Sequence, residues 1–123
     1  MKYIGKNEEL LNFLTEEKIN ILDAEISRFD IYYEDYQLKI DVYMTLTKNH
    51  FQNDRELKLQ FQNITEYCLY HNYDHHFYCI TNYKFFKGDK GFYISFDPYE
   101  EISDIQPEDN DFIISKEIEG SFL

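Results

Sequence analysis

The most regular pattern in the sequence is an alternation of apolar and polar residues between Gln37 and Thr47. Its apolar members are Leu38, Ile40, Val42, Met44 and Leu46. Neighbouring side chains of a β-strand point to opposite faces of a sheet, so a period of two places all five on one face. A helix would distribute them around its circumference. The stretch is therefore predicted to form a long strand with one face in the core and the other in water.

The same alternation recurs in shorter form along the chain. It predicts further strands at 27–33, 57–62 and 92–96. A less regular stretch and two runs of consecutive apolar residues predict strands at 66–70, 76–81 and 112–115, the last of which Ile118 and Phe122 can extend. Turn signals separate them at Glu34 to Tyr36, in the polar segment 48–54, at His71 to Asp74, and at Lys87 to Gly91. Strands at intervals of about ten residues are typical of a sandwich, a barrel or a strongly curled sheet.

A single helix is predicted near the N-terminus. Asn7 suits the N-cap, and apolar residues follow it at helical spacing as far as Lys18. Residues 1–5 form either a short strand or a frayed end. At 123 residues the chain has the length of one domain. The predicted fold is mainly β: a single domain over residues 1–123, with an antiparallel sandwich or barrel-like sheet of about seven strands and one short helix.

The chain carries a formal net charge of -12, with 24 acidic and 12 basic residues. A surface of this sign repels the phosphates of nucleic acids and of anionic membranes, which argues against both as partners. It favours a basic protein partner or cations, and it also keeps a protein soluble without any site being involved. The charge therefore narrows the class of partner but does not locate a site.

Cys68 and Cys79 are the only cysteines, and no signal segment is recognisable at the start of the sequence. No apolar run approaches the roughly 18 residues of a membrane span. These observations predict a cytoplasmic protein with reduced thiols. Because the two cysteines flank a predicted turn near residue 73, we expect them to pack close together without forming a disulfide.

Metal-ligating side chains gather in the segment between the two cysteines. The candidate zinc ligands are His71, Asp74, His75 and His76. Adjacent His75 and His76 would point to opposite faces of a strand, which argues against a shared site. The segment also lacks the C-x-x-C and H-E-x-x-H spacings that mark zinc sites. A polar hairpin tip is the favoured interpretation, and no cofactor is predicted.

Seven acidic residues and no basic residue lie between Asp97 and Asp111. Carboxylates can hold calcium, but the ligand order of the helical calcium-binding loop is absent, and a solvated surface loop is the simpler interpretation. Tyr99 adds a rigid aromatic side chain of the kind that anchors protein interfaces. If the loop binds a partner, we expect Tyr99 to be the anchor. The steering charges would be Glu100, Glu101, Asp104, Glu108, Asp109 and Asp111.

Tyrosine is abundant, and several tyrosines fall on strand faces that are predicted to be wet. They belong to the set Tyr32, Tyr36, Tyr43, Tyr67, Tyr70, Tyr73, Tyr93 and Tyr99, which cannot all lie in the core. Exposed tyrosines are enriched at protein interfaces. The preference of aromatic residues for strands explains them equally well.

The segment from Phe92 to Ile118 reads Phe-Tyr-Ile-Ser-Phe-Asp-Pro-Tyr-Glu and then Asp-Asn-Asp-Phe-Ile-Ile-Ser-Lys around the acidic stretch. In this segment the chain resembles small uncharacterised bacterial proteins, some of which are similar to immunity proteins encoded beside toxins. The resemblance contains no catalytic motif, and no functional residue is carried over from it. It implies a binding role in which an acidic protein neutralises a basic toxin.

Three functions are compatible with these features. The favoured one is a non-enzymatic acidic binding protein that captures a basic protein partner, as a toxin-neutralising immunity protein would. The second is a small metal-dependent hydrolase that uses the region from His71 to His76, although spacing alone places no base beside a nucleophile. The third is a ligand-binding β domain.

Overall fold

The computed structural model describes residues 2–16, 19–47, 56–74 and 78–123. These ranges form seven strands and one helix. In chain order the elements are β1 (Lys2–Lys6), α1 (Glu8–Thr15), β2 (Glu25–Glu34), β3 (Gln37–Thr45), β4 (Glu56–Cys68), β5 (Lys84–Gly88), β6 (Gly91–Asp97) and β7 (Asn110–Phe122). The predicted mainly β fold with one short helix is confirmed. Within the described chain, no helix is long and apolar enough to cross a membrane.

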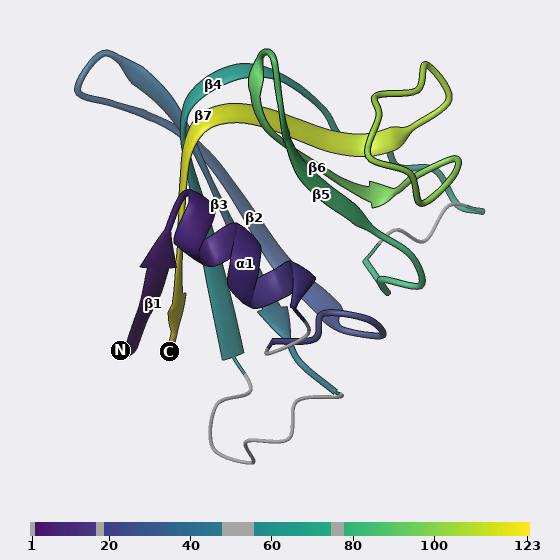
Figure 1. Ribbon diagram of the computed structural model, residues 1–123, viewed down its shortest axis with the longest axis horizontal. Helices are drawn as coiled ribbons and strands as arrows, with labels where there is room; N and C mark the ends of the chain where they lie inside the picture. Colours follow the sequence, from purple (N-terminus) through teal and green to yellow (C-terminus); the bar gives the residue numbers. More distant parts are fainter. Residues whose placement is uncertain (1, 17–18, 48–55, 75–77) are drawn as a thin grey trace.

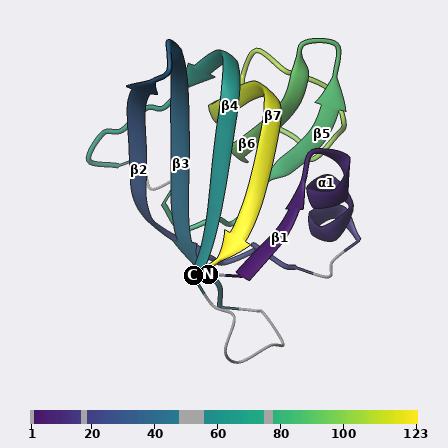
Figure 2. The ribbon, with the colours of Figure 1, turned by 90° about the vertical axis from the view of Figure 1, so that its left-hand side faces the viewer.

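All seven strands belong to one antiparallel sheet (Figure 1). The strand order is β2-β3-β4-β7-β6-β5, and β1 pairs with the C-terminal part of β7. Figure 2 shows β2 as the outermost strand on one side, followed by β3, β4 and β7. The end strands β2 and β5 do not pair with each other, so the sheet is curled but not closed into a barrel.

The curl of the sheet arises in its two longest strands, β4 and β7, which bend together (Figure 1). Within β4, Asn63 has a positive φ of 53°, and the register with β7 shifts between Ile64 and Glu66. Such a bulge bends a strand and increases its twist. The sequence predicted two strands, 57–62 and 66–70, on either side of this point. The structure joins them into one bent strand, because the bulge interrupts the alternation without ending the pairing.

One continuous cluster of apolar side chains fills the inside of the curled sheet. The region of β3 and β4 contributes Ile40, Val42, Met44, Leu46, Leu57, Leu59 and Phe61, all of them buried. The core face predicted from the alternating pattern is confirmed for these residues. Leu38 is only half-buried, because it lies at the start of β3, next to the turn where the β2–β3 hairpin extends beyond the core.

The helix α1 packs Leu10 and Leu14 against this core. Asn7 occupies the predicted N-cap position, but its side chain does not cap the helix. Its Oδ1 accepts the backbone N–H of Ile118 at 3.0 Å, and its own N–H donates to the carbonyl of the same residue at 2.7 Å. Asn7 therefore ties the start of the helix to β7. The helix ends at Thr15, earlier than predicted, and Lys18 lies outside the described residues.

Two tight turns are present where the sequence predicts them. Asp35 and Tyr36 connect β2 to β3 with φ values of 53° and 63°, the left-handed conformation that a two-residue hairpin turn requires. Gly88 pairs with Gly91 at the end of the β5–β6 hairpin, and Gly91 has a φ of 123°. Glycine tolerates this conformation because it has no Cβ.

Replacing Gly91 with alanine is expected to lower the free energy of unfolding by about 2–3 kcal/mol. At this φ any other residue is strained, and a Cβ would lie 2.4 Å from the carbonyl oxygen of Ser115 on β7. Urea unfolding followed by circular dichroism measures the loss. Gly88→Ala is the matched control, because its Cβ would meet no atom closer than 3.4 Å. Equal losses in the two variants would show that the close approach to β7 is unimportant.

The predicted strand at 76–81 is wrong over its described part. Residues 78–81 form only an isolated bridge between Cys79 and Glu25. Here Ile80 is buried while Tyr78 and Cys79 are exposed, so the apolar run inserts one side chain into the core rather than forming a strand. Residues 76 and 77, and the predicted loop 48–54, lie outside the described residues. The strand before the hairpin turn is β5 instead.

Candidate binding loop

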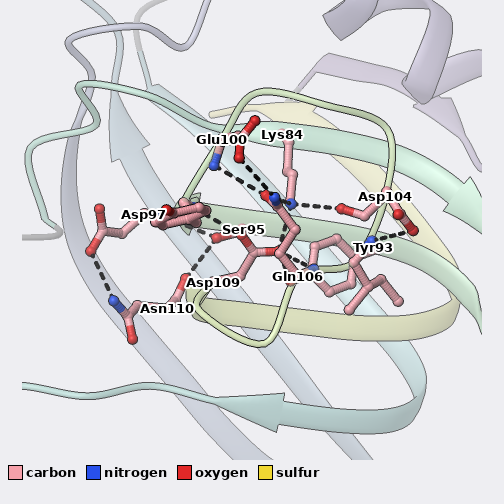
Figure 3. A network of polar contacts seen from close by, with 11 residues as sticks. Lys84, Tyr93, Ser95, Asp97, Glu100, Asp104, Gln106, Asp109 and Asn110 are labelled. Atoms are coloured by element: carbon pink, nitrogen blue, oxygen red, sulfur yellow. Dashed lines mark hydrogen bonds and ion pairs between the residues drawn. The ribbon is translucent and has the colours of Figure 1, made fainter.

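The predicted acidic site falls mainly on one connection, residues 98–109 between β6 and β7, which we call the acidic loop. Figure 3 shows the polar contacts beneath it. Side chains from β5 and β6 reach up to the loop and hold it, so its conformation depends on residues that are distant in the sequence. The loop is therefore an ordered part of the fold, with an inner side that packs on strands and an outer side in water.

Asp109, the last residue of the acidic loop, is its organising residue (Figure 3). Its Oδ1 accepts the backbone N–H of Tyr99 at 2.9 Å, and its Oδ2 accepts that of Gln106 at 3.1 Å. Oδ2 also accepts the hydroxyl of Tyr93 at 2.7 Å and lies 2.6 Å from the ammonium of Lys84. A single buried carboxylate thus joins both ends of the loop to β5 and β6.

The ammonium group of Lys84 is buried together with Asp109. Besides the carboxylate, it donates to the carbonyl of Asp104 at 2.6 Å and to Oε1 of Gln106 at 3.3 Å. It also lies 5.7 Å from the centre of the Tyr93 ring. An ammonium has three donors, and here each has an acceptor, so the cost of burying the charge is offset by its contacts.

The protonation states of Asp109 and Tyr93 follow from this arrangement. Burial raises the pKa of the Asp109 carboxyl, but hydrogen bonds from Lys84, the Tyr99 backbone and Tyr93 outweigh it, and the pKa lies below its usual value of 3.8. Burial first, and then the bond to Asp109, raise the pKa of Tyr93 above its usual value of 10. At neutral pH the carboxylate is therefore charged and the phenol remains a proton donor.

Two of the acids predicted to face a partner are interior residues. Asp109 is buried in the contacts described above, and Asp111 is fully buried at the start of β7. Asp111 has a φ of 51° and accepts the backbone N–H of Tyr70 at 2.8 Å. The prediction that these two carboxylates steer a partner is therefore corrected. Both carboxylates accept backbone N–H groups that would otherwise be unsatisfied: Asp109 those of Tyr99 and Gln106 in the loop, and Asp111 that of Tyr70 after β4.

The outer side of the acidic loop keeps the remaining predicted residues at the surface. Tyr99 is 62% exposed, and Glu100, Glu101, Asp104 and Glu108 are exposed as well. Two apolar side chains of the same stretch join them. Ile102 is 44% exposed and Ile105 is 42% exposed. The structure therefore brings together three large exposed side chains of apolar character and four carboxylates on one short loop.

Two open hollows flank this part of the loop. One, of about 290 Å³, lies between α1, β5 and the loop, with Leu14, Phe86 and Ile102 in its lining and Glu101 beside them. The other, of about 280 Å³, lies between the β5–β6 turn and the loop, and includes Asp104 and Ile105. Residues 102–105 stand between the two. The apolar residues of the loop thus border recesses in which side chains of a partner can be received.

The histidine segment gathers no comparable site among the residues that are described. His71 and Asp74 are exposed, and Asp74 N–H donates to Oδ1 of Asn72 at 2.8 Å, as in a polar turn. His75 and His76 lie outside the described residues. In the described ranges no three His, Cys, Asp or Glu side chains come together as a metal site requires. Among its described residues, His71 and Asp74 give no geometry from which hydrolase chemistry can be derived.

The two cysteines are both free, but they are exposed rather than packed as predicted. Cys68 pairs with Phe112 at the end of β4, whereas Cys79 bridges to Glu25 at the start of β2. The two cysteines lie on different strands' edges because the described residues 78–81 bridge to β2 and do not return alongside β4. Exposure makes both thiols accessible to reagents in the folded protein.

The tyrosines differ widely in burial. Tyr93 is buried, stacked on Phe112 with ring centroids 5.6 Å apart, and is a structural residue of the loop. Tyr36, Tyr73 and Tyr99 are strongly exposed. Of these, only Tyr99 lies on the acidic loop. Tyr32 and Tyr43 are half-buried on the polar face of the sheet, where the Tyr32 hydroxyl donates to Asp41 at 3.3 Å.

Sequence inspection missed Lys84, the residue on which the acidic loop depends most. One signal was present: Lys84 is a single cation within the aromatic run Tyr83-Lys84-Phe85-Phe86. A lysine among aromatic residues on a strand is either a surface position or a buried charge with a partner. Nothing in the spacing indicates that its partner is Asp109, because the two meet only through the pairing of β5 with β6 and of β6 with β7.

The sequence matches no family model, and neither a curated protein nor a solved structure was found to match it.

Proposed function

We propose that this protein is a non-enzymatic binding protein whose acidic loop docks onto a basic protein partner. The observation that carries the proposal is the combination of exposed Tyr99, Ile102 and Ile105 with four exposed carboxylates on a loop held by buried contacts. Covering exposed apolar side chains with a partner removes apolar area from water, which favours binding. Carboxylates around them select a partner of opposite charge.

The order of the loop supports this role. A loop that is flexible before binding loses conformational freedom when it docks, and this loss reduces affinity. Here the Asp109 carboxylate, the Lys84 ammonium and the Tyr93 hydroxyl fix the loop before any partner arrives. Because these groups lie inside the protein, the outer carboxylates remain available to a partner. The loop therefore has the features of a preorganised interface.

The charge of the whole chain supports the same class of partner. A net charge of -12 attracts a basic protein at long range and raises its association rate. Toxins that cleave nucleic acids carry basic clefts for phosphate, and carboxylates of the loop can take the positions of phosphates there. A basic nuclease toxin that is neutralised in this way is the partner we propose, in keeping with the resemblance of residues 92–118 to small uncharacterised bacterial proteins, some of which are similar to immunity proteins.

The test measures association with a candidate partner, a basic protein encoded by a neighbouring gene. Glu100→Gln, Glu101→Gln and Asp104→Asn are combined in one variant, which keeps the side-chain shapes and removes three charges. Its association rate constant is expected to fall by roughly three- to tenfold at low salt, with a weaker dependence on ionic strength. Stopped-flow or surface plasmon resonance measurements from about 20 to 500 mM salt give both quantities.

A matched variant distinguishes the effect of charges on the loop from the effect of the net charge of the whole protein. It combines Glu25→Gln, Glu56→Gln and Asp74→Asn, which change the net charge equally at exposed positions outside the loop.

The aromatic anchor is tested in the same way. Tyr99→Ala is expected to raise the dissociation constant by about 30-fold as an interface anchor, whereas Tyr73→Ala leaves it unchanged. Equal effects of the loop and control variants would remove the acidic loop from the interface. Failure to bind any basic neighbour would overturn the proposed function.

A further inference from the structure

The β2 strand has an open outer edge, at the opposite end of the strand order from β5 and its contacts with the acidic loop (Figure 2). The start of this edge is covered: Ile26 N–H donates to the carbonyl of Tyr78 at 2.7 Å, and Ile80 N–H to that of Ala24 at 2.9 Å. From Asp30 to Glu34, no strand of the described chain pairs with the outer side. An unpaired edge of this length is a template for strand addition.

The backbone groups that face outward can be identified from the turn. Glu34 pairs with Gln37 across the two-residue turn, and such a turn closes on a hydrogen-bonded pair. Glu34, Tyr32 and Asp30 therefore direct their N–H and C=O groups toward β3. Ile31 and Tyr33, which alternate with them, direct theirs away from the sheet. Their side chains are also exposed, at 43% for Ile31 and 70% for Tyr33.

We propose that this edge pairs with the same edge of a second copy of the chain, antiparallel and centred on Ile31. The regular part of β2 runs from Arg28 to Glu34, since a register shift lies just before Arg28 and the turn follows Glu34. Ile31 is the middle residue of this stretch. A two-fold axis there places Ile31 opposite itself, and the two copies exchange backbone hydrogen bonds at the axis.

The side chains on both faces suit this register. On the apolar face, Tyr33 lies opposite Phe29 of the second copy, which gives an aromatic pair on either side of the central isoleucines. On the polar face, Arg28 lies opposite Glu34 of the second copy, so the two-fold axis creates two ion pairs. A register centred on Phe29 would instead pair Tyr33 with Glu25, which already bridges to Cys79.

Charges on an edge strand normally prevent association with other strands. In β2 they are arranged so that a second copy meets opposite charges. Within one chain, Arg28 also pairs with Asp30 at 2.8 Å and Lys39 with Glu34 at 3.0 Å, and in each pair one side chain is exposed and the other half-buried. These contacts are screened by water and can be shared with a second copy. Complementary charge, together with the exposed Ile31 and Tyr33, favours a second copy over an unrelated strand.

Sedimentation velocity of the purified protein tests the proposal first. At chain concentrations from about 10 µM to 1 mM the weight-average mass is expected to rise from that of one chain, 15.1 kDa, toward twice this value. Ile31→Pro removes only an outward N–H and should raise the dissociation constant at least tenfold, whereas Ile31→Val should leave it within about twofold. A wild-type protein that remains monomeric at all these concentrations overturns the proposal.

Charge reversal tests the register. Arg28→Glu and Glu34→Arg each place like charges opposite one another in a dimer of identical chains, so each variant alone is expected to be monomeric. In a mixture of the two variants both ion pairs are restored, one with its native sign and one with the sign reversed, and a heterodimer should form. Native mass spectrometry with one variant labelled with ¹⁵N identifies it. Thermal unfolding is the control that each variant is folded, and with both variants folded a mixture that stays monomeric contradicts the Ile31-centred register.

Discussion

Replacing Lys84 with methionine is expected to lower the free energy of unfolding by about 3–5 kcal/mol. Methionine has a similar length but no charge, so the Asp109 carboxylate would remain buried without its cation. The carbonyl of Asp104 and the amide oxygen of Gln106 would lose their donor as well. Chemical unfolding of both proteins, followed by tyrosine fluorescence and circular dichroism, measures the difference. A loss below about 1 kcal/mol would mean that the buried pair contributes no more than a surface pair.

Two further variants test whether the loss comes from breaking the buried pair or from removing any lysine. Lys87→Met removes the neighbouring lysine of β5, whose partner is the exposed Glu8, and should cost no more than about 0.5 kcal/mol. Adding Asp109→Asn to Lys84→Met removes the unpaired charge and keeps one oxygen, which can accept one of the two N–H groups, of Tyr99 and Gln106, that the two carboxylate oxygens accept in the wild type. This double variant is therefore expected to be more stable than Lys84→Met alone. If it is less stable, a buried charge is not the cause of the loss.

The difference in unfolding free energy between wild type and Lys84→Met should depend on pH in a predictable direction. The pKa of Asp109 lies below its usual value of 3.8 in the folded protein, so its charged form stabilises the fold above that value. This stabilisation is lost as pH falls from 3.8 through the lowered pKa. The stability gap between wild type and Lys84→Met should therefore be full near neutral pH and should narrow in this acid range. A gap that is constant with pH would indicate that Lys84 acts by packing alone.

The strand pattern is the part of the fold that sequence could predict. It follows from a local rule, since every second residue of β3 faces the core whatever the strand pairs with. The β-bulge at Asn63 and the insertion of Ile80 could not be predicted in this way. Both are places where the chain departs from regular pairing to fit a curled sheet, and an Asn or an apolar run does not specify such a departure.

The candidate site illustrates the same limit. The position of Tyr99 on an acidic loop is visible in the sequence, because composition alone marks that stretch. The roles of Asp109 and Asp111 are not visible, because seven acids look alike until their burial is known. The structure divides them by burial: Asp109 and Asp111 are interior, where they accept the backbone N–H groups of residues distant in the sequence, whereas Glu100, Glu101, Asp104 and Glu108 are exposed. The burial of Asp109 involves Lys84, which contacts the loop only in the folded structure.

Replacing Val42 with aspartate is expected to destabilise the protein on the order of 5 kcal/mol, enough to unfold much of it. Val42 is 0% exposed at the centre of β3, between Phe29 and Leu59 on the neighbouring strands. A carboxylate there would have no partner and would have to be buried or protonated. Ser121→Asp introduces the same residue on the polar face of the sheet beside Lys58 and should change stability by no more than about 0.5 kcal/mol. Thermal and urea unfolding compare the two variants with wild type. A stable, cooperatively folding Val42→Asp protein would mean that the alternating residues of β3 have been assigned to the wrong faces.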